Sequence, residues 1–402
     1  MASKKILCFL FLTITALNLF AQDVEIQKEN KGDITLSFPT TAMFKDNEYL
    51  RKIAYGYTLA GVRMVPQIEY QPLENLKISL GVNLLRYWGA NEYSSYNYVG
   101  VPYYDSVNVQ HQLHYKPFFR VNWQINHNLN FIIGNIYTTN YHYLPIALFN
   151  PELVFSQDAQ EGLQLLYKDE YWQNDTWLDW QNFNFYRDID REQFAFGTSG
   201  NISTAKVLDK HKIGLSYAII WQHHGGELDT VRTPDLDQWS NGMIGAFYTY
   251  NFSDRYNSKL TLNANYMFSE DFKNHTWRFS SGKAFSIETT YKNDCLEAKV
   301  GYFDSKKFIS FYGDAFFSNL AQRDLSITYP HNQMLYSTIS YDINLNKTTT
   351  IQKSKYIMSF VGEVYYKLDD KNSIEKEKKN FSIALGVVFK AKPSFRLFNK
   401  KI

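Results

Sequence analysis

One stretch, residues 107–124, limits what this chain can fold into, because its side chains alternate almost without fault between apolar and polar. Alternation with a period of two indicates a β-strand with one apolar and one hydrated face. The stretch is also long, since a tilted strand needs about 9–11 residues to cross a bilayer and strands of globular proteins average about 5–6. If one such strand spans a membrane, the chain must supply a closed set, because no open sheet edge can remain in lipid.

The same alternation recurs along the chain, and short connections alternate with long ones over most of it. We count about 16 strands, within roughly 14–18, which predicts an all-β fold: a transmembrane antiparallel up-and-down β-barrel with short periplasmic turns and long extracellular loops. The first strand is placed at residues 34–38, before a long connection at 39–57, and residues 304–331 are assigned to the longest loop. The other expected strands lie near 58–70, 76–84, 107–124, 129–138, 162–168, 176–182, 194–205, 213–222, 244–252, 259–268, 285–291, 296–302, 335–343, 356–366 and 381–389.

The alternative architecture is a soluble all-β sandwich, which also alternates. Its strands should be short, and its inner faces must pack against each other. Here the apolar face is unusually aromatic, with 31 Tyr and 30 Phe in the chain, and the other face carries charged and amide side chains in mid-strand. Such groups are costly in a packed core and are natural in a watery lumen. The pattern therefore favours the membrane barrel.

Residues 1–21 are predicted to be a secretory signal peptide, with Lys4 and Lys5 before an apolar stretch and Ala21 at the cleavage site. A helical membrane anchor is the alternative, but the apolar run is short and a polar segment follows it. Residues 22–402 then form a single barrel domain. Without the two leader lysines, 40 Lys and Arg face 40 Asp and Glu, so no basic excess argues for nucleic acid. Cys295 is the only cysteine after the leader, which excludes a disulfide framework or a cysteine metal site.

Four stretches carry a resemblance to the porin-like outer-membrane barrels of Gram-negative bacteria, and more narrowly to uncharacterised barrels of the Bacteroides and Flavobacterium group. They are Lys116-Pro117-Phe118-Phe119-Arg120-Val121, Phe149-Asn150-Pro151-Glu152-Leu153, Glu161-Gly162-Leu163-Gln164-Leu165 and Asp179-Trp180-Gln181-Asn182-Phe183. The resemblance implies contact with outer-membrane lipid and recognition by the barrel-assembly machinery through a final strand that ends in an aromatic residue. Gly386 and Phe389 fit that pattern, but residues 390–402 extend beyond it. Either the signal is internal, or residues 395–398 belong to the last strand.

Polar side chains expected on the inward faces are the candidate functional residues. They support a hydrated passage whose charges tune ion selectivity. The alternative is a lumen closed by paired side chains and an infolded loop. The candidate lumen-lining residues are Arg63, Glu69, His114, Lys116, Arg120, Lys259, Asn263, Glu288 and Glu363.

Other candidate sites have weaker support from the sequence. His223, His224 and Glu227 could offer ligands to a metal, but adjacent histidines point to opposite sides of an extended chain, so a solvated loop is the default. Tyrosines in residues 89–106 fit a position at the membrane interface. A barrel enzyme needs a base beside a nucleophile, and His111 on the lipid-side face is the one residue worth testing.

The predicted function is an outer-membrane porin-like channel for passive diffusion of small hydrophilic solutes, with no cofactor, no metal and no enzymatic activity. The alternative is a surface receptor or structural barrel whose long loops bind a partner or polysaccharide. A lipid-modifying enzyme is the third hypothesis. By analogy with trimeric porins, the protein is expected to form a homo-oligomer.

Overall fold

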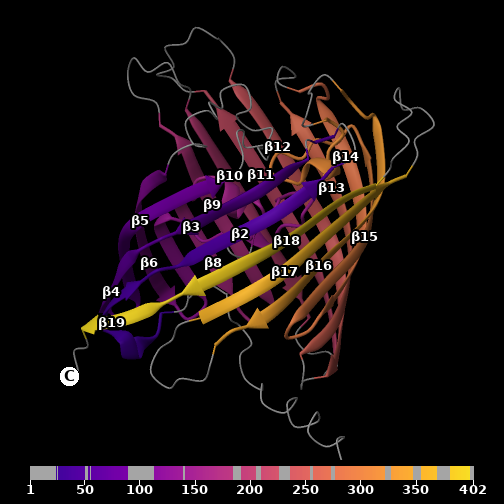
Figure 1. Cartoon of the computed structure of the whole chain (residues 1–402). Helices are drawn as coiled ribbons and strands as arrows, with labels where there is room; N and C mark the ends of the chain where they lie inside the picture. Colours follow the sequence, from indigo (N-terminus) through magenta and orange to yellow (C-terminus); the bar gives the residue numbers. More distant parts are fainter. Residues whose placement is uncertain are drawn as a thin grey trace, which may run out of the picture.

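The computed structural model is a closed antiparallel β-barrel, as the alternation predicted (Figure 1). It describes residues 24, 26–49, 53–54, 56–88, 113–138, 141–183, 192–204, 210–225, 236–253, 257–272, 277–321, 327–346, 355–368 and 381–398. The predicted signal peptide and the residues after 398 lie outside these ranges. The first strands, in indigo, lie beside the last strands, in yellow, where β18 pairs with β2 and closes the sheet (Figure 1).

Nineteen strand segments make up the sheet. They are β1 (Ile34–Ser37), β2 (Thr40–Glu48), β3 (Tyr57–Met64), β4 (Gln67–Leu73), β5 (Leu76–Trp88), β6 (His114–Asn126), β7 (Leu129–Asn135), β8 (Glu161–Lys168), β9 (Trp172–Asn182), β10 (Gln193–Ser203), β11 (His211–His224), β12 (Asp237–Ser253), β13 (Ser258–Asp271), β14 (Ser281–Lys292), β15 (Leu296–Lys306), β16 (His331–Asn344), β17 (Lys355–Lys367), β18 (Phe381–Lys392) and β19 (Ser394–Phe398). The short helices are η1 (Lys28–Asn30), η4 (Tyr141–Tyr143), α1 (Leu153–Ser156) and η5 (Ala315–Phe317).

Three prolines divide three of the barrel strands, so the nineteen segments form sixteen spanning strands. Pro39 separates β1 from β2, Pro66 lies between β3 and β4, and Pro393 lies between β18 and β19. Proline lacks the N–H that a sheet ladder requires, so each strand breaks there and resumes beyond it. These three strands are neighbours, and the amide of Val65 donates to the carbonyl of Pro39 at 2.8 Å across the break.

Two details of the strand ends differ from the sequence prediction. Residues 39–57 were expected to be a connection, but β2 lies within them and closes the barrel against β18. The alternation of β2 was missed because Pro39 interrupts it. At the other end, β19 pairs with β1, so residues 395–398 belong to the last strand.

The outer wall of the barrel is apolar along its strands. Side chains that alternate with buried ones remain exposed there. In β6, Tyr115 on the outward face is 71% exposed, whereas Phe118 on the inward face is 7% exposed. Only a surface surrounded by lipid tolerates a continuous belt of this kind, and a closed barrel leaves no backbone group unpaired in it. Among the described residues, no helix is long and apolar enough to cross a membrane.

Two long connections fold into the barrel and fill the half of the lumen at the long-loop end. We call them loop A (residues 136–160) and loop B (residues 307–330), and together the plug. The plug packs on inward apolar side chains of β9 to β17 to form one hydrophobic core. Its members include Leu148, Phe149, Phe308, Phe311 and Phe317 from the loops, and Trp177, Ile220, Met267, Phe303 and Tyr365 from the wall. This half of the lumen is therefore not the polar interior that the sequence pattern suggested.

The plug leaves a cavity of about 580 Å³ in the half of the barrel that ends in short turns. Its wall comes from β2, β3, β5, β6 and β14 to β18, and its roof comes from loop A. The N-terminal segment also enters this half, where the carbonyl of Val24 accepts hydrogen bonds from Asn122 at 2.9 Å and Asn130 at 3.1 Å.

Candidate functional site

Four of the predicted lumen residues, Arg63, His114, Lys116 and Arg120, contact loop A. Arg63 donates to the carbonyls of Val154, at 2.7 Å, and Gln157. His114 and Lys116 both pair with Asp158, the histidine at 2.6 Å. These side chains bind the infolded loop to the barrel wall through hydrogen bonds and ion pairs.

Another predicted residue, Glu363, belongs to a buried charge cluster. Lys45 Nζ lies 3.0 Å from Glu363 and 3.1 Å from Glu152 of loop A. Tyr57 donates a short hydrogen bond to Glu152, and Tyr365 donates to Glu363 at 3.1 Å. A buried charge is tolerated only when it is paired and hydrogen-bonded, so this cluster fixes loop A to β2, β3 and β17.

Arg120 and the remaining predicted residues have separate hydrogen-bond partners or line a second cavity. Arg120 donates to the carbonyl of Ile136 at 3.2 Å and stacks over Tyr137 at 3.8 Å. Glu69 accepts from Gln67 at 2.6 Å, and Glu288 accepts from Tyr336 at 3.0 Å. Lys259 and Asn263 line a second cavity of about 390 Å³ near the short turns. Five of the predicted residues, Arg63, Glu69, Arg120, Glu288 and Glu363, therefore line the cavity of about 580 Å³, whereas Lys259 and Asn263 line the other one.

Among the described residues, three histidines pair with an aspartate, which is an arrangement that can orient a catalytic base. The first pair, His142 with Asp175, is almost wholly enclosed: Nδ1 lies 2.9 Å from the carboxylate, and the side chains are 0% and 3% exposed. Gln160 binds the other ring nitrogen at 2.7 Å, and Trp177 stacks on the ring at 3.9 Å. Burial alone lowers the pKa of His142, but the charge and hydrogen bonds of Asp175 and Gln160 together outweigh it and raise that pKa above its ordinary value.

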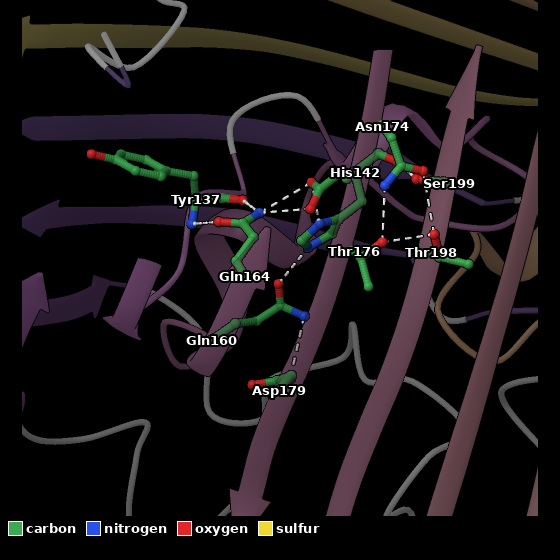
Figure 2. Close-up of polar contacts among 10 residues, drawn as sticks. Tyr137, His142, Gln160, Gln164, Asn174, Thr176, Asp179, Thr198 and Ser199 are labelled. Carbon is green, nitrogen blue, oxygen red and sulfur yellow. Dashed lines mark hydrogen bonds and ion pairs between the residues drawn. The ribbon is translucent and has the colours of Figure 1, made fainter. Parts of the chain in front are cut away.

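The surroundings of this pair are a structural network and not a catalytic triad. Gln164 links the pair to the backbone of Tyr137 through bonds of 2.8 and 2.9 Å and reaches Asp175 at 2.9 Å (Figure 2). The Ser199 hydroxyl donates to the backbone carbonyl of His142, not to its ring. Because both ring nitrogens are occupied and no face is open, the pair anchors loop A and leaves no place for a substrate.

The second pair, His114 with Asp158, faces the lumen and joins the wall to loop A. The third pair lies on the outside of the barrel. His331 opens β16 and Asp304 lies near the end of β15; Nε2 is 3.0 Å from Oδ1, and the side chains are 32% and 30% exposed. They are diagonal neighbours across the strand pair, since His331 is opposite Lys306 and Asp304 is opposite Gln333.

Two further side chains hold Asp304. Gln333 donates to its Oδ2 at 2.7 Å, and Tyr302 donates to the same oxygen at 3.1 Å. No hydrogen bond to Nδ1 of His331 occurs among the described residues. The tautomer with Nε2–H directed at the carboxylate would leave a lone pair on Nδ1 toward the surroundings, which is the arrangement of an oriented general base.

The alternation of the strands places this pair on the lipid-facing side. Val300 and Leu335 on the same faces are 60% and 45% exposed, whereas Phe303 and Met334 on the opposite faces are 0% and 1% exposed. Both catalytic candidates lie at the ends of β15 and β16 that lead into loop B. The pair is therefore open to the bilayer at the long-loop end.

Sequence reasoning missed this pair because it assigned residues 304–331 to a loop. The strands extend through both ends of that range, so the period-two rule, continued from Tyr302 and Leu335, would have found the lipid-facing positions of Asp304 and His331. The histidine chosen from sequence, His111, lies outside the described residues, as does Glu227.

The other histidines of the predicted metal loop do not form a site. His223 faces outward, stacks on Phe194 at 4.6 Å and contacts the carbonyl of Gly225 at 2.6 Å. His224 is buried against Trp239. Within the described ranges, no group of three or more His, Cys, Asp or Glu side chains is placed to hold a metal ion.

Comparison with known proteins yields one family. The model of the family described as lipid A 3′-O-deacylase-type matches residues 26–400. No match to a curated protein was found.

Similar solved structures are outer-membrane proteins. OprD from Pseudomonas aeruginosa is 12% identical over 94% of this chain and 97% of that chain, with a TM-score of 0.48. OccAB4 of Acinetobacter baumannii is 7% identical over 91% of this chain and 100% of that chain, also with a TM-score of 0.48. OmpTdeltaL8, a loop-deletion mutant of an outer membrane protein of Vibrio cholerae, is 12% identical over 90% and 99% of the two chains, with a TM-score of 0.44.

The family match corrects one prediction. The chain was expected not to be an enzyme, and that expectation is wrong, because the matching family is an enzyme family. The physical reason for the error is that side chains that meet across two strands leave no contiguous motif in the sequence. The narrower resemblance to barrels of the Bacteroides and Flavobacterium group stays a prediction.

Proposed function

The chain belongs to the lipid A 3′-O-deacylase-type family, and on this premise we propose that it hydrolyses an O-linked acyl ester of lipid A with His331 and Asp304 as its catalytic pair. The observation that carries the proposal is the position of this pair on the lipid-facing wall. A lipid reaches a membrane enzyme sideways from the bilayer, so its reacting ester must meet groups on the outside of the barrel. The other two pairs are engaged with loop A inside the lumen.

The proposed reaction is a general-base hydrolysis. Nδ1 of His331 takes a proton from a water molecule, whose oxygen attacks the acyl carbonyl carbon to form a tetrahedral intermediate. The bond between that carbon and the sugar oxygen then breaks, and the imidazolium returns its proton to the sugar oxygen. The products are a free fatty acid and a sugar hydroxyl. Asp304 holds the ring orientation and stabilises the imidazolium, while Gln333 and Tyr302 hold Asp304.

The test is deacylation by the purified barrel in detergent or liposomes. Lipid A is incubated with the protein, and mass spectrometry follows the loss of one acyl chain and the release of the fatty acid. Replacing His331 by Asn removes the base, and we expect the rate to fall by roughly 10²–10⁴-fold, the usual contribution of general-base catalysis. Replacing Asp304 by Asn should also lower the rate, because the ring loses its orienting anion.

His211 provides a matched control. It faces lipid at the opposite end of the barrel, at the start of β11, and contacts the Tyr248 hydroxyl at 2.6 Å. His211→Asn makes the same chemical change on the same outer surface and should leave the rate unaltered. A folded wild-type barrel that releases no fatty acid, or a His331→Asn variant with full activity, would refute the catalytic assignment.

Passive diffusion of solutes has less support. In the described part of the barrel, the long-loop half of the lumen contains the apolar core of loops A and B, and an apolar constriction opposes the entry of water and ions. The receptor hypothesis depends on long loops that lie largely outside the described residues.

The export and assembly of the barrel are proposals of the same standing. A cleaved signal peptide at residues 1–21 would deliver the chain to the envelope. Recognition by the barrel-assembly machinery would use the last strand, which ends at Phe398 in β19. A homo-oligomer stays a proposal by analogy with porins.

A further inference from the structure

Three basic side chains, one of them the catalytic candidate His331, form a row across the outer wall. Lys283 of β14 is opposite Lys306 of β15, and Lys306 is opposite His331 of β16. Both lysines are exposed, and strand alternation places them on the lipid-facing side with Phe285 and Asp304. The row lies at the long-loop end, where the wall meets the lipid headgroups.

The two lysines have no countercharge in the described part of the protein. No ion pair of either one occurs there, and Asp304 is already engaged with His331, Gln333 and Tyr302. Lys283 is opposite Phe268 of β13, and Ser281 is opposite Glu270. No ion pair joins Glu270 to Lys283 in the described part of the protein. Like charges directly opposite each other in an antiparallel pair are unfavourable, so an external anion would stabilise this arrangement.

The register of β14 to β16 sets the order in which these side chains follow one another from the long-loop end toward the middle of the membrane. The row of Lys283, Lys306 and His331 is followed, two residues further along each strand, by Phe285, Asp304 and Gln333. Two residues correspond to about 6.7 Å along a strand. Next come apolar side chains exposed to lipid, including Ile287 and Leu335. The cations and the base share the outer row, the carboxylate lies one row deeper, and an apolar belt follows, so a phosphate and a sugar ester of a phosphorylated glycolipid would lie side by side at the outer rows with the acyl chains along the belt.

We propose that Lys283 and Lys306 bind a phosphate group of the membrane glycolipid and thereby place its ester beside His331. The inference rests on the proposed function and names the feature of the substrate that the site selects. Ammonium groups bind phosphate oxygens by charge-assisted hydrogen bonds, which are stronger than neutral ones and strengthen further away from bulk water. A dephosphorylated glycolipid would lose this contact while keeping its apolar contacts.

The experiment measures binding separately from turnover. The His331→Asn barrel in detergent is titrated with phosphorylated lipid A and with dephosphorylated lipid A, and native mass spectrometry gives the affinity for each. Adding Lys283→Gln and Lys306→Gln should lower the affinity for the phosphorylated lipid by about tenfold or more, the effect of losing charge-assisted contacts. The affinity for the dephosphorylated lipid should not change. Lys210→Gln removes an exposed lysine from the turn directly before β11, at the short-turn end of the barrel, and should change the affinity for neither lipid.

The outcomes separate this inference from the proposed function. Equal affinity losses for both lipids, or no loss for either, would overturn the phosphate site. Displacement of the lipid by an equal concentration of inorganic phosphate would also overturn it, because free phosphate would then be the ligand. Phosphate-dependent binding by a wild-type barrel that releases no fatty acid would uphold the site and refute the hydrolase. Fatty-acid release without a preference for the phosphorylated lipid would uphold the hydrolase and refute the phosphate site.

Discussion

At the scale of single residues, the charges inside the barrel are arranged around one buried cation. Lys45 lies between Glu152 and Glu363, and Asp314 of loop B is close enough to interact with the same group. One positive charge does not balance three carboxylates, of which Glu152 and Asp314 are buried. Burial, followed by repulsion from Glu363, raises the pKa of Asp314 to about 7. The plug therefore contains a carboxyl group that titrates near neutral pH.

This titration predicts a pH-dependent stability of the plug. The pKa of Asp314 in the folded protein lies above its ordinary value of 3.8, so its contribution is complete below about pH 4 and is lost as the pH rises through about 7. We expect the thermal midpoint of barrel unfolding to fall as the pH is raised from about 5 to 8. Asp314→Asn should flatten that dependence and raise the midpoint at pH 8, because an amide oxygen can still accept the bond from the Phe316 amide, 3.0 Å long in the native chain.

Asp294→Asn is the control for this prediction. Asp294 is exposed in a short turn and bonds to Asn257 at 3.1 Å, so its replacement should leave the pH profile unchanged. A wild-type midpoint that stays constant across this pH range would contradict the buried, uncompensated carboxyl group at Asp314.

At the scale of elements, loops A and B behave as one body. The amide of Asn150 donates to the carbonyl of Tyr312 at 2.7 Å, and the amide of Asp314 donates to the carbonyl of Ile146 at 3.1 Å. Gly313 lies where the loops touch, and a Cβ atom there would overlap the carbonyl of Ala147. Because each loop supplies backbone partners to the other, loosening the anchor of loop A should also loosen loop B.

Removing Lys45 tests this coupling. Lys45→Ala leaves Glu152 and Glu363 buried without a countercharge, and breaking a buried pair in this way costs about 3–5 kcal/mol. We expect faster hydrogen exchange in both loops, within residues 141–160 and 307–321. Lys116→Ala is the matched control, because Lys116 and Asp158 are each 44% exposed and exposed pairs contribute about 0–1 kcal/mol. Faster exchange in loop A alone would show that the loops are independent.

The strands could be predicted from the sequence, and the plug could not. Tyr115 and Trp123 alternate with polar neighbours because one face meets lipid, and that periodicity is visible without a structure. The apolar residues of loop B, such as Phe308 and Phe317, have no period, because they pack in an irregular segment whose neighbours come from distant strands. The candidate site was missed for a related reason: His331 and Asp304 are 27 positions apart and meet only through the register of β15 and β16.

At the scale of the whole molecule, the barrel has apolar surfaces on both sides of part of its wall. The outside faces lipid, and the inside of the long-loop half packs on the plug, where Phe308 and Phe317 are fully buried. Burying a side chain of this size contributes about 1.5–3 kcal/mol, so the plug is held by its core as well as by its ion pairs. A wall of this kind suits a closed barrel that works on its outer surface.

The apolar core inside the lumen predicts a silent barrel in a planar bilayer. Refolded wild-type protein should show no steady, salt-dependent open steps, because ions would have to cross the apolar core around Phe311 and Trp239. Lys45→Ala should produce brief openings if loosening the plug exposes a wetted path. Stable conductance in the wild type, with an ion preference that reverses on Arg120→Glu, would instead establish a pore beside the plug, and lipid hydrolysis and solute passage would then have to be assigned to opposite faces of the same wall.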